Sequence, residues 1–212
     1  MNYLNTIKNH WQTIIVTTLI MVVLSLILSL IKPLEYRTRV DLLIIQKQSA
    51  NMDSYQSARA SEKLAQTLIS VIKTKSFLSK VLNTNFNIDK NKLPKNEKDL
   101  RTVWNKKISA NLLQESSILR VDVFDKNKIQ SNKIANAVAF ILINDSNEYH
   151  GSGSSVVIKI VNEPLTSNYP ARPNIILNIF FGLVIGLILS LANIFYKINK
   201  KLENNIYNNF NN

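Results

Sequence analysis

Two long apolar stretches bracket a polar middle segment in this chain. The first covers residues 13–31 and the second residues 175–196, and neither contains a charged side chain. As an α-helix, each is long enough to cross a hydrocarbon core about 30 Å thick. No small-x-small cleavage pattern follows the first stretch, which favours an uncleaved anchor over a signal peptide. The pattern predicts two transmembrane helices, with residues 32–174 on one side of a membrane and residues 1–12 and 197–212 on the other.

Between these stretches, the spacing of apolar positions alternates between the strand period and the helix period. Strands are predicted at residues 36–46, 107–113, 117–124 and 156–161. Helices are predicted at residues 58–73, from about residue 75, at 97–105 and at 125–149. This order predicts an α+β fold: one domain of a small sheet packed with helices, flanked by two transmembrane helices. We expect the first and last strands to pair, because each adjoins a predicted span.

The charge of the chain is strongly basic, with 26 Lys and Arg against 14 Asp and Glu and a formal net charge of +12. The bases are spread along the middle segment without interleaved aromatic residues, so no nucleic-acid partner is expected. Lys and Arg near the ends of the spans are almost balanced between the two sides and lean slightly toward a cytoplasmic middle domain, so charge does not settle the orientation. The absence of cysteine excludes disulfides and thiolate metal sites.

The middle segment contains no recognisable set of catalytic residues. The middle segment has no phosphate-binding glycine loop, and its one histidine, His150, is expected to be a solvated residue at a helix end. Asp122 and Asp125 have the spacing of a carboxylate pair, but a position on a polar strand face for the first and a helix cap for the second are favoured. We therefore expect no catalytic residue, no cofactor and no metal.

Two motifs indicate an architectural role instead. Pro164, Pro170 and Pro173 lie in a connector, residues 163–173, that leads into the second span and is expected to be rigid because proline fixes φ. Gly182 and Gly186 form a G-x-x-x-G pattern inside that span, which permits close approach of a second helix. The partner of this face is either the first span of the same chain or a neighbouring copy.

Taken in order, several stretches resemble the polysaccharide co-polymerase family, also called chain-length determinant proteins. They are the first span followed by Tyr36-Arg-Thr-Arg-Val40, the stretch from Leu68 to Leu78, Asp125 followed by Ile134-Ala-Asn136, and the proline connector leading into Gly182 and Gly186. The short middle domain is closest in size to compact capsule and exopolysaccharide members. The resemblance implies an α/β domain outside the bacterial cytoplasmic membrane, cytoplasmic termini and assembly as a homo-oligomeric ring.

The resemblance also implies a non-enzymatic function, namely control of the chain length or export of capsular, exopolysaccharide or O-antigen-type polymers. The expected partners are a polysaccharide polymerase or flippase, membrane lipid and, for some members, a cytoplasmic tyrosine kinase that the tail activates. No motif in residues 197–212 supports the kinase role here. Two alternatives stay open: a two-span sensor or adaptor with an external ligand-binding domain, and a scaffold of an envelope-spanning secretion machine.

Overall fold

The computed structural model describes residues 10–47, 53–113, 116–150 and 155–210. The chain divides into two compact units, and each is described by itself. Residues up to Pro33 and from Arg172 onward form a helical unit that contains α2 (Trp11–Ile31) and α8 (Ile175–Phe210). Leu34–Ala171 form an α/β domain. The predicted α+β class with two apolar helices flanking one domain is confirmed.

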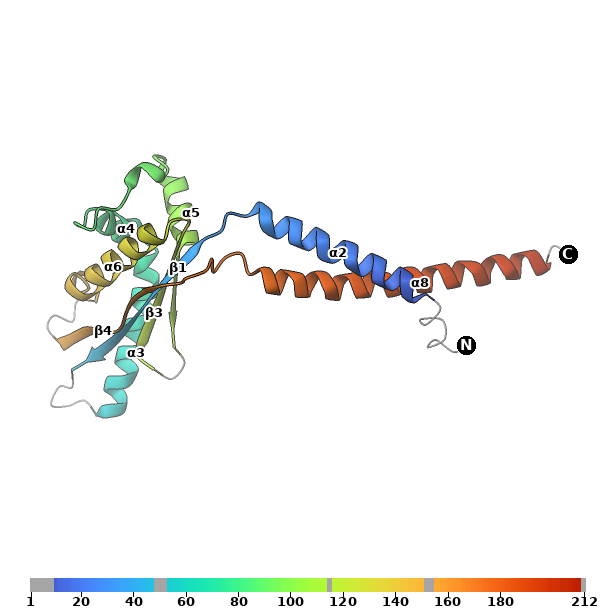
Figure 1. The fold of residues 1–212 in the computed structure, drawn as a ribbon. Helices are drawn as coiled ribbons and strands as arrows, with labels where there is room; N and C mark the ends of the chain where they lie inside the picture. The colour runs from blue at the N-terminus through green and yellow to red at the C-terminus, as the bar shows by residue number, and fades with distance from the viewer. Residues whose placement is uncertain (1–9, 48–52, 114–115, 151–154, 211–212) are drawn as a thin grey trace. The chain divides into compact units, whose positions relative to one another are not determined.

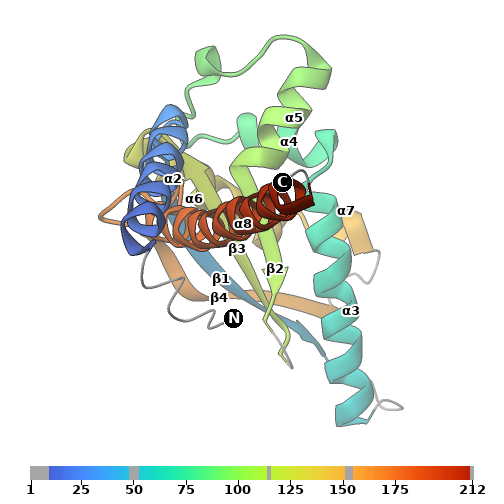
Figure 2. The same ribbon diagram turned by 90° about the vertical axis from the view of Figure 1, so that its right-hand side faces the viewer.

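One antiparallel sheet of four strands forms the centre of the α/β domain (Figures 1 and 2). The strands are β1 (Tyr36–Gln46), β2 (Ile108–Leu112), β3 (Ile118–Asp125) and β4 (Val156–Thr166), in the order β2-β3-β1-β4. The expected pairing of the first and last strands is confirmed, because β1 pairs with β4 on one side and with β3 on the other.

Helices α3 (Ser54–Ile72) and α6 (Lys128–Asn144) supply much of the core that covers one face of this sheet. Alternate β1 side chains Val40, Leu42 and Ile44 are almost completely buried, as the strand period requires. The remaining helical elements are α4 (Lys75–Leu82), α5 (Glu97–Lys107), α7 (Asn147–His150) and the 3₁₀ turn η1 (Lys90–Lys92). A buried hydroxyl pair, Thr38 and Ser131 at 2.8 Å, adds a polar contact between β1 and α6.

Two helices start at residues that differ from the prediction, and capping side chains explain both starts. Helix α3 begins at Ser54 rather than near residue 58, because Asp53 accepts a hydrogen bond from the Gln56 amide and so caps the helix early. The long helix predicted from residue 125 begins at Lys128, where the Asn127 side chain accepts from the first free amides. It ends at Asn144, and α7 follows as a separate turn. Asp125 therefore ends β3 and is not the cap of α6.

Strand β4 extends five residues beyond its predicted end and includes Pro164. The pairing of β1 with β4 shifts register twice, between the partners of Arg39 and Asp41 and between those of Asp41 and Leu42. Proline has no amide hydrogen to donate, so in sheets it is confined to edge strands and bulges. Because β4 is an edge strand, Pro164 is accommodated at this irregularity, and the first part of the predicted connector belongs to the sheet.

The face of the sheet opposite the apolar core carries a charged ladder across β1 and β3. Arg39 donates to both carboxylate oxygens of Asp122, at 2.7 and 2.9 Å, and Arg120 does the same to Asp41, at 2.8 and 2.9 Å. Asn162 on β4 donates a further hydrogen bond to Asp41. The hydrogen bonds from Arg120 and Asn162 outweigh the effect of burial and hold the pKa of Asp41 below its usual range.

Because the pKa of Asp41 is lowered in the folded state, the stabilisation from the hydrogen bonds to its carboxylate depends on pH. The contribution is complete above the ordinary aspartate pKa of about 3.9 and is lost as pH falls through the lower pKa of the folded protein. We expect Asp41→Asn to lower the free energy of unfolding by about 2 kcal/mol at pH 7, the scale of hydrogen bonds to a charged group. We also expect a smaller loss of stability below pH 4 in this variant than in the wild-type protein.

The measurement is urea unfolding of the full chain in detergent, followed by the fluorescence of Trp104, a buried residue of the α/β domain. Both proteins carry Trp11→Phe, which removes the other tryptophan of the chain. The matched control is Glu62→Gln, which changes an exposed carboxylate on α3. Equal acid sensitivity of Asp41→Asn and the wild type would show that Asp41 does not carry this pH dependence.

Candidate functional site

Helices α2 and α8 pack against each other in the helical unit (Figure 1). Both are long and apolar enough to cross a membrane, and only 6% and 17% of their apolar stretches are buried within the protein. Neither is therefore a buried core helix of a soluble protein. On α8, the buried positions among the described side chains form one row with a spacing of four residues: Gly182, Gly186, Ser190 and Ile194. The observed contact uses the small-residue face predicted from the sequence.

The two glycines permit an approach that a larger residue would prevent. A Cβ atom added at Gly182 would lie 2.8 Å from Cβ of Ser25, and one added at Gly186 would lie 2.8 Å from Cα of Thr18. Contacts this short require the helices to separate. Since both neighbours belong to α2 of the same chain, the structure places the first span against the glycine face. No neighbouring copy is needed to fill it.

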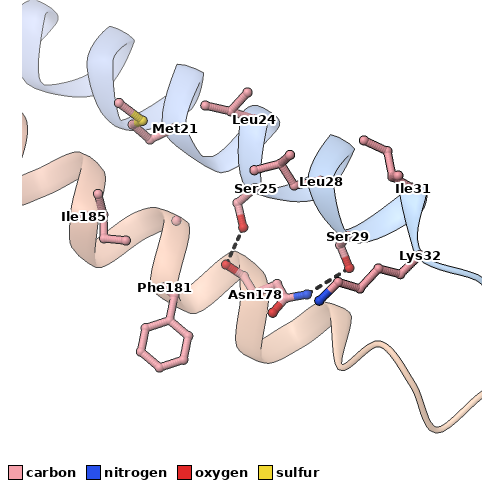
Figure 3. A pocket seen from close by; sticks show the side chains of 11 residues that line it. Met21, Leu24, Ser25, Leu28, Ser29, Ile31, Lys32, Asn178, Phe181 and Ile185 are labelled. Carbon is pink, nitrogen blue, oxygen red and sulfur yellow. Dashed lines mark hydrogen bonds between the residues drawn. The ribbon is translucent and has the colours of Figure 1, made fainter. Parts of the chain in front are cut away.

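Polar side chains add hydrogen bonds to this contact near the start of α8 (Figure 3). The Ser25 hydroxyl donates to the backbone carbonyl of Asn178 at 2.6 Å, and the Asn178 amide donates to the Ser29 hydroxyl at 2.9 Å. Interhelical hydrogen bonds of this kind contribute on average about 0.6 kcal/mol in membranes. The contact is therefore held by close packing, with a modest polar contribution that also fixes which residues face each other.

Sequence reasoning missed Asn178 as part of this contact. The available signal was an amide side chain inside an apolar run, because polar residues within spans usually face another helix. Ser25 and Ser29 are spaced four residues apart on α2, and together with Asn178 they would have indicated where the helices meet. The pattern could not decide between a partner in the same chain and a partner in another.

An apolar groove of about 700 Å³ runs beside the contact (Figure 3). Leu24 and Leu28 of α2 and Phe181 and Ile185 of α8 are among its lining residues, and Lys32 lies at its α2 end. Inside a bilayer, lipid chains are the solvent for such a surface, so the groove adds no specific ligand to the description of the site.

The predicted coupling prolines occupy three different environments. Pro164 lies in β4, Pro170 follows that strand, and Pro173 precedes the first residue of α8 by two positions. Past the end of β4, the α/β domain keeps its two ends paired: the Ser167 amide donates to the carbonyl of Arg37, and the Ala171 amide donates to that of Glu35, both at 2.8 Å. Pro170 therefore lies in a segment that is held against the beginning of β1. Rigidity of the connector stays a prediction.

The candidate acidic residues do not converge on a common point. Asp122 pairs with Arg39 on the charged ladder, whereas Asp125 pairs with Lys107 and accepts from the Asn127 amide. Positions 122 and 125 lie on opposite faces of β3 because strand side chains alternate, so the two carboxylates do not flank one substrate. Among the described residues, no group of three or more His, Asp or Glu side chains could hold a metal ion.

We expect a cysteine pair at Ser29→Cys and Asn178→Cys to cross-link within one chain under mild oxidation, because the two side chains are in direct contact. The natural chain has no cysteine, so the background is clean. The control pair, Ile20→Cys with Ile188→Cys, replaces two exposed side chains and should not cross-link within the chain. Mass spectrometry of the cross-linked peptides and gel mobility distinguish the products. A Ser29–Asn178 cross-link found only between chains would contradict the observed packing.

Comparison with known proteins gives one family match. Residues 1–84 match the family model described as Wzz, chain length determinant protein. The matched part contains α2, β1, α3 and α4, and it includes two of the stretches on which the resemblance was stated. No curated protein matches the chain. The match supports a role in polysaccharide chain length determination. Over these 84 residues, which make up less than half of the chain, the protein is similar to chain length determinant proteins, the polysaccharide co-polymerase family.

Proposed function

We propose that this protein is a non-enzymatic membrane regulator that sets the chain length of a capsular or exopolysaccharide polymer, or controls its export. The observation that carries the proposal is the family match over a segment that includes the first apolar helix and the first strand of the domain. The structure adds support, because the rest of the chain completes a two-helix unit and a single α/β domain.

The proposed mechanism is architectural. The glycine face joins α2 to α8, and strand pairing joins β1 to β4, so the two chain segments are joined within each unit. Function would then depend on how domains of several copies are arranged around the growing polymer. Because α2 occupies the glycine face, a homo-oligomeric ring would use other surfaces, such as the lipid-exposed side chains of the two helices or the α/β domain.

A polysaccharide polymerase or flippase is the partner that this role requires. Membrane lipid would contact the exposed apolar side chains of α2 and α8. Helix α8 continues to Phe210, beyond its apolar stretch. A cytoplasmic tyrosine kinase, the partner that the resemblance implies for some members, would meet this helical extension.

The proposed location is the bacterial cytoplasmic membrane, with the α/β domain outside and both termini in the cytoplasm. Long domains are translocated largely regardless of their charge, so the near-balanced distribution of Lys and Arg is compatible with this orientation. A Ser70→Cys variant, exposed on α3, should react with a membrane-impermeant maleimide in intact cells. Protection of this cysteine until the membrane is permeabilised would contradict the proposal.

Loss of the gene should change the modal length of the surface polysaccharide, and the wild-type gene should restore it. Gly186→Leu should fail to restore the length, because a side chain there collides with the backbone of α2. Ile188→Leu, on the lipid-exposed side of the same helix, should restore it fully. The measurement is the length distribution of purified polymer at matched protein levels. An unchanged length and yield in the deletion strain would rule out the proposed function.

A further inference from the structure

A polar recess of about 700 Å³ lies on the sheet face that carries the charged ladder. Its walls come from β1, β3, β4 and the segment just after β4. Its lining residues include Arg37, Arg39, Arg120, Asn162, Glu163 and Ser167. Apart from Leu165, the side chains around this recess are polar or charged, which distinguishes it from the apolar groove between α2 and α8.

The irregular pairing of β4 lies next to this recess. The register shifts around Asp41 leave Asn162 opposite Asp41 and Leu165 opposite Arg39, so two residues of β4 between these partners face one residue of β1. Such a bulge bends its strand and redirects side chains. Pro164 lies at this point, in a strand position that needs no amide donor. One of the prolines singled out from the sequence therefore lies at the bulge that borders a candidate binding surface.

Two arginines of the recess are fixed in place with part of their hydrogen-bonding capacity unused. Arg39 and Arg120 each reach their aspartate through Nε and Nη2. A guanidinium has five N–H donors, and within the described part of the chain the Nη1 group of each arginine has no hydrogen-bond partner. The side chains of Arg39 and Arg120 are 33% and 28% exposed, whereas that of Asp41 is only 3% exposed. A ligand would thus meet preorganised donors, with Asp41 enclosed beneath them.

Arg37 differs from Arg39 and Arg120 in its charge partners. It lies two positions before Arg39 on β1, and therefore on the same face of the sheet. Its backbone is held by Ser167, whose hydroxyl accepts from the Arg37 amide at 3.1 Å. In the described part of the chain, no acidic side chain pairs with its guanidinium, although Arg39 and Arg120 are both paired. The recess thus presents one guanidinium that no described carboxylate pairs with, beside two paired ones, and the Glu163 carboxylate also lines it.

We propose that this recess binds a carboxylate-bearing sugar unit of an acidic polysaccharide. Arg37 would take the carboxylate, since a guanidinium matches a carboxylate in a bidentate pair. The Nη1 donors of Arg39 and Arg120 and the side-chain oxygen of Asn162, whose amide nitrogen donates to Asp41, would bind ring hydroxyls. The identification of the ligand as part of a bacterial surface polysaccharide rests on the proposed function. The expectation that these side chains bind a carboxylate-bearing sugar does not.

The test is binding of tetragalacturonate to the full chain in nanodiscs of zwitterionic lipid, measured by calorimetry at low salt. We expect binding that weakens as ionic strength rises, and no binding of the methyl-esterified tetrasaccharide, which lacks the negative charge. Arg37→Gln should raise the dissociation constant roughly tenfold, the scale of one charge-assisted interaction. Arg37→Lys should recover part of the loss, because it restores the charge without the planar fork.

The matched control is Arg101→Gln, which removes an exposed arginine from α5 outside the recess and should leave the dissociation constant unchanged. Equal weakening by Arg101→Gln, or equal binding of the esterified sugar, would reduce the interaction to general charge and overturn the site. Absence of tetragalacturonate binding at millimolar concentration would also overturn it. So would Arg37-dependent binding confined to anionic lipid vesicles. These readouts use purified protein, so they are independent of the polymer length in cells. The binding site can be disproved while polymer length still depends on the gene, and binding can be confirmed while polymer length does not depend on it.

Discussion

Backbone pairing between β1 and β4 is the constraint on which the α/β domain depends. These strands are the first and last of the domain, and their pairing brings together the two ends of a segment of more than one hundred residues. The pairing continues past β4, where the Ala171 amide reaches the Glu35 carbonyl at 2.8 Å. Loop closure on this scale is an entropic cost that the sheet and its buried face must offset. The rest of the fold then follows, with β3 and β2 added beyond β1 and helices covering the apolar face.

The helical unit also brings together two distant stretches of the chain, but by a different physical means. In a membrane, apolar surface gives no net drive for helices to associate, so close packing and interhelical hydrogen bonds decide the contact. Gly182 and Gly186 provide the close approach, and Asn178 with Ser25 and Ser29 provides the hydrogen bonds. The N-terminal stretch with α2 and β1 is thus joined twice to the C-terminal stretch with β4 and α8. The α2–α8 contact joins them in the helical unit, and the β1–β4 pairing joins them in the α/β domain.

The two long apolar stretches and the strand and helix periods of the apolar positions predicted most of this architecture. The two apolar helices, the four strands and the pairing of β1 with β4 follow from periodicity and chain order. Boundaries were less predictable, because single capping side chains set them: Asp53 starts α3 early, and Asn127 delays α6. The extension of β4 through Pro164 was missed because proline normally argues against a strand, and only its edge position permits it. The pairing of Arg39 with Asp122 and of Arg120 with Asp41 depends on strand register, which alternation alone does not specify.

A direct test interrupts the chain at the second of the two places where it passes between the units, between Ala171 and Arg172 at the proline connector. A flexible Gly-Ser-Gly-Ser insertion there leaves every strand pair and the α2–α8 contact intact, and lengthens only the connection. The same insertion between the exposed residues Lys95 and Asn96 is the matched control. If the protein acts by coupling its domain to its membrane helices, the junction insertion should broaden the polymer length distribution or abolish its modal length, and the control should not. A wild-type distribution with the junction insertion, at normal protein level, would contradict coupling through the proline connector as the basis of function.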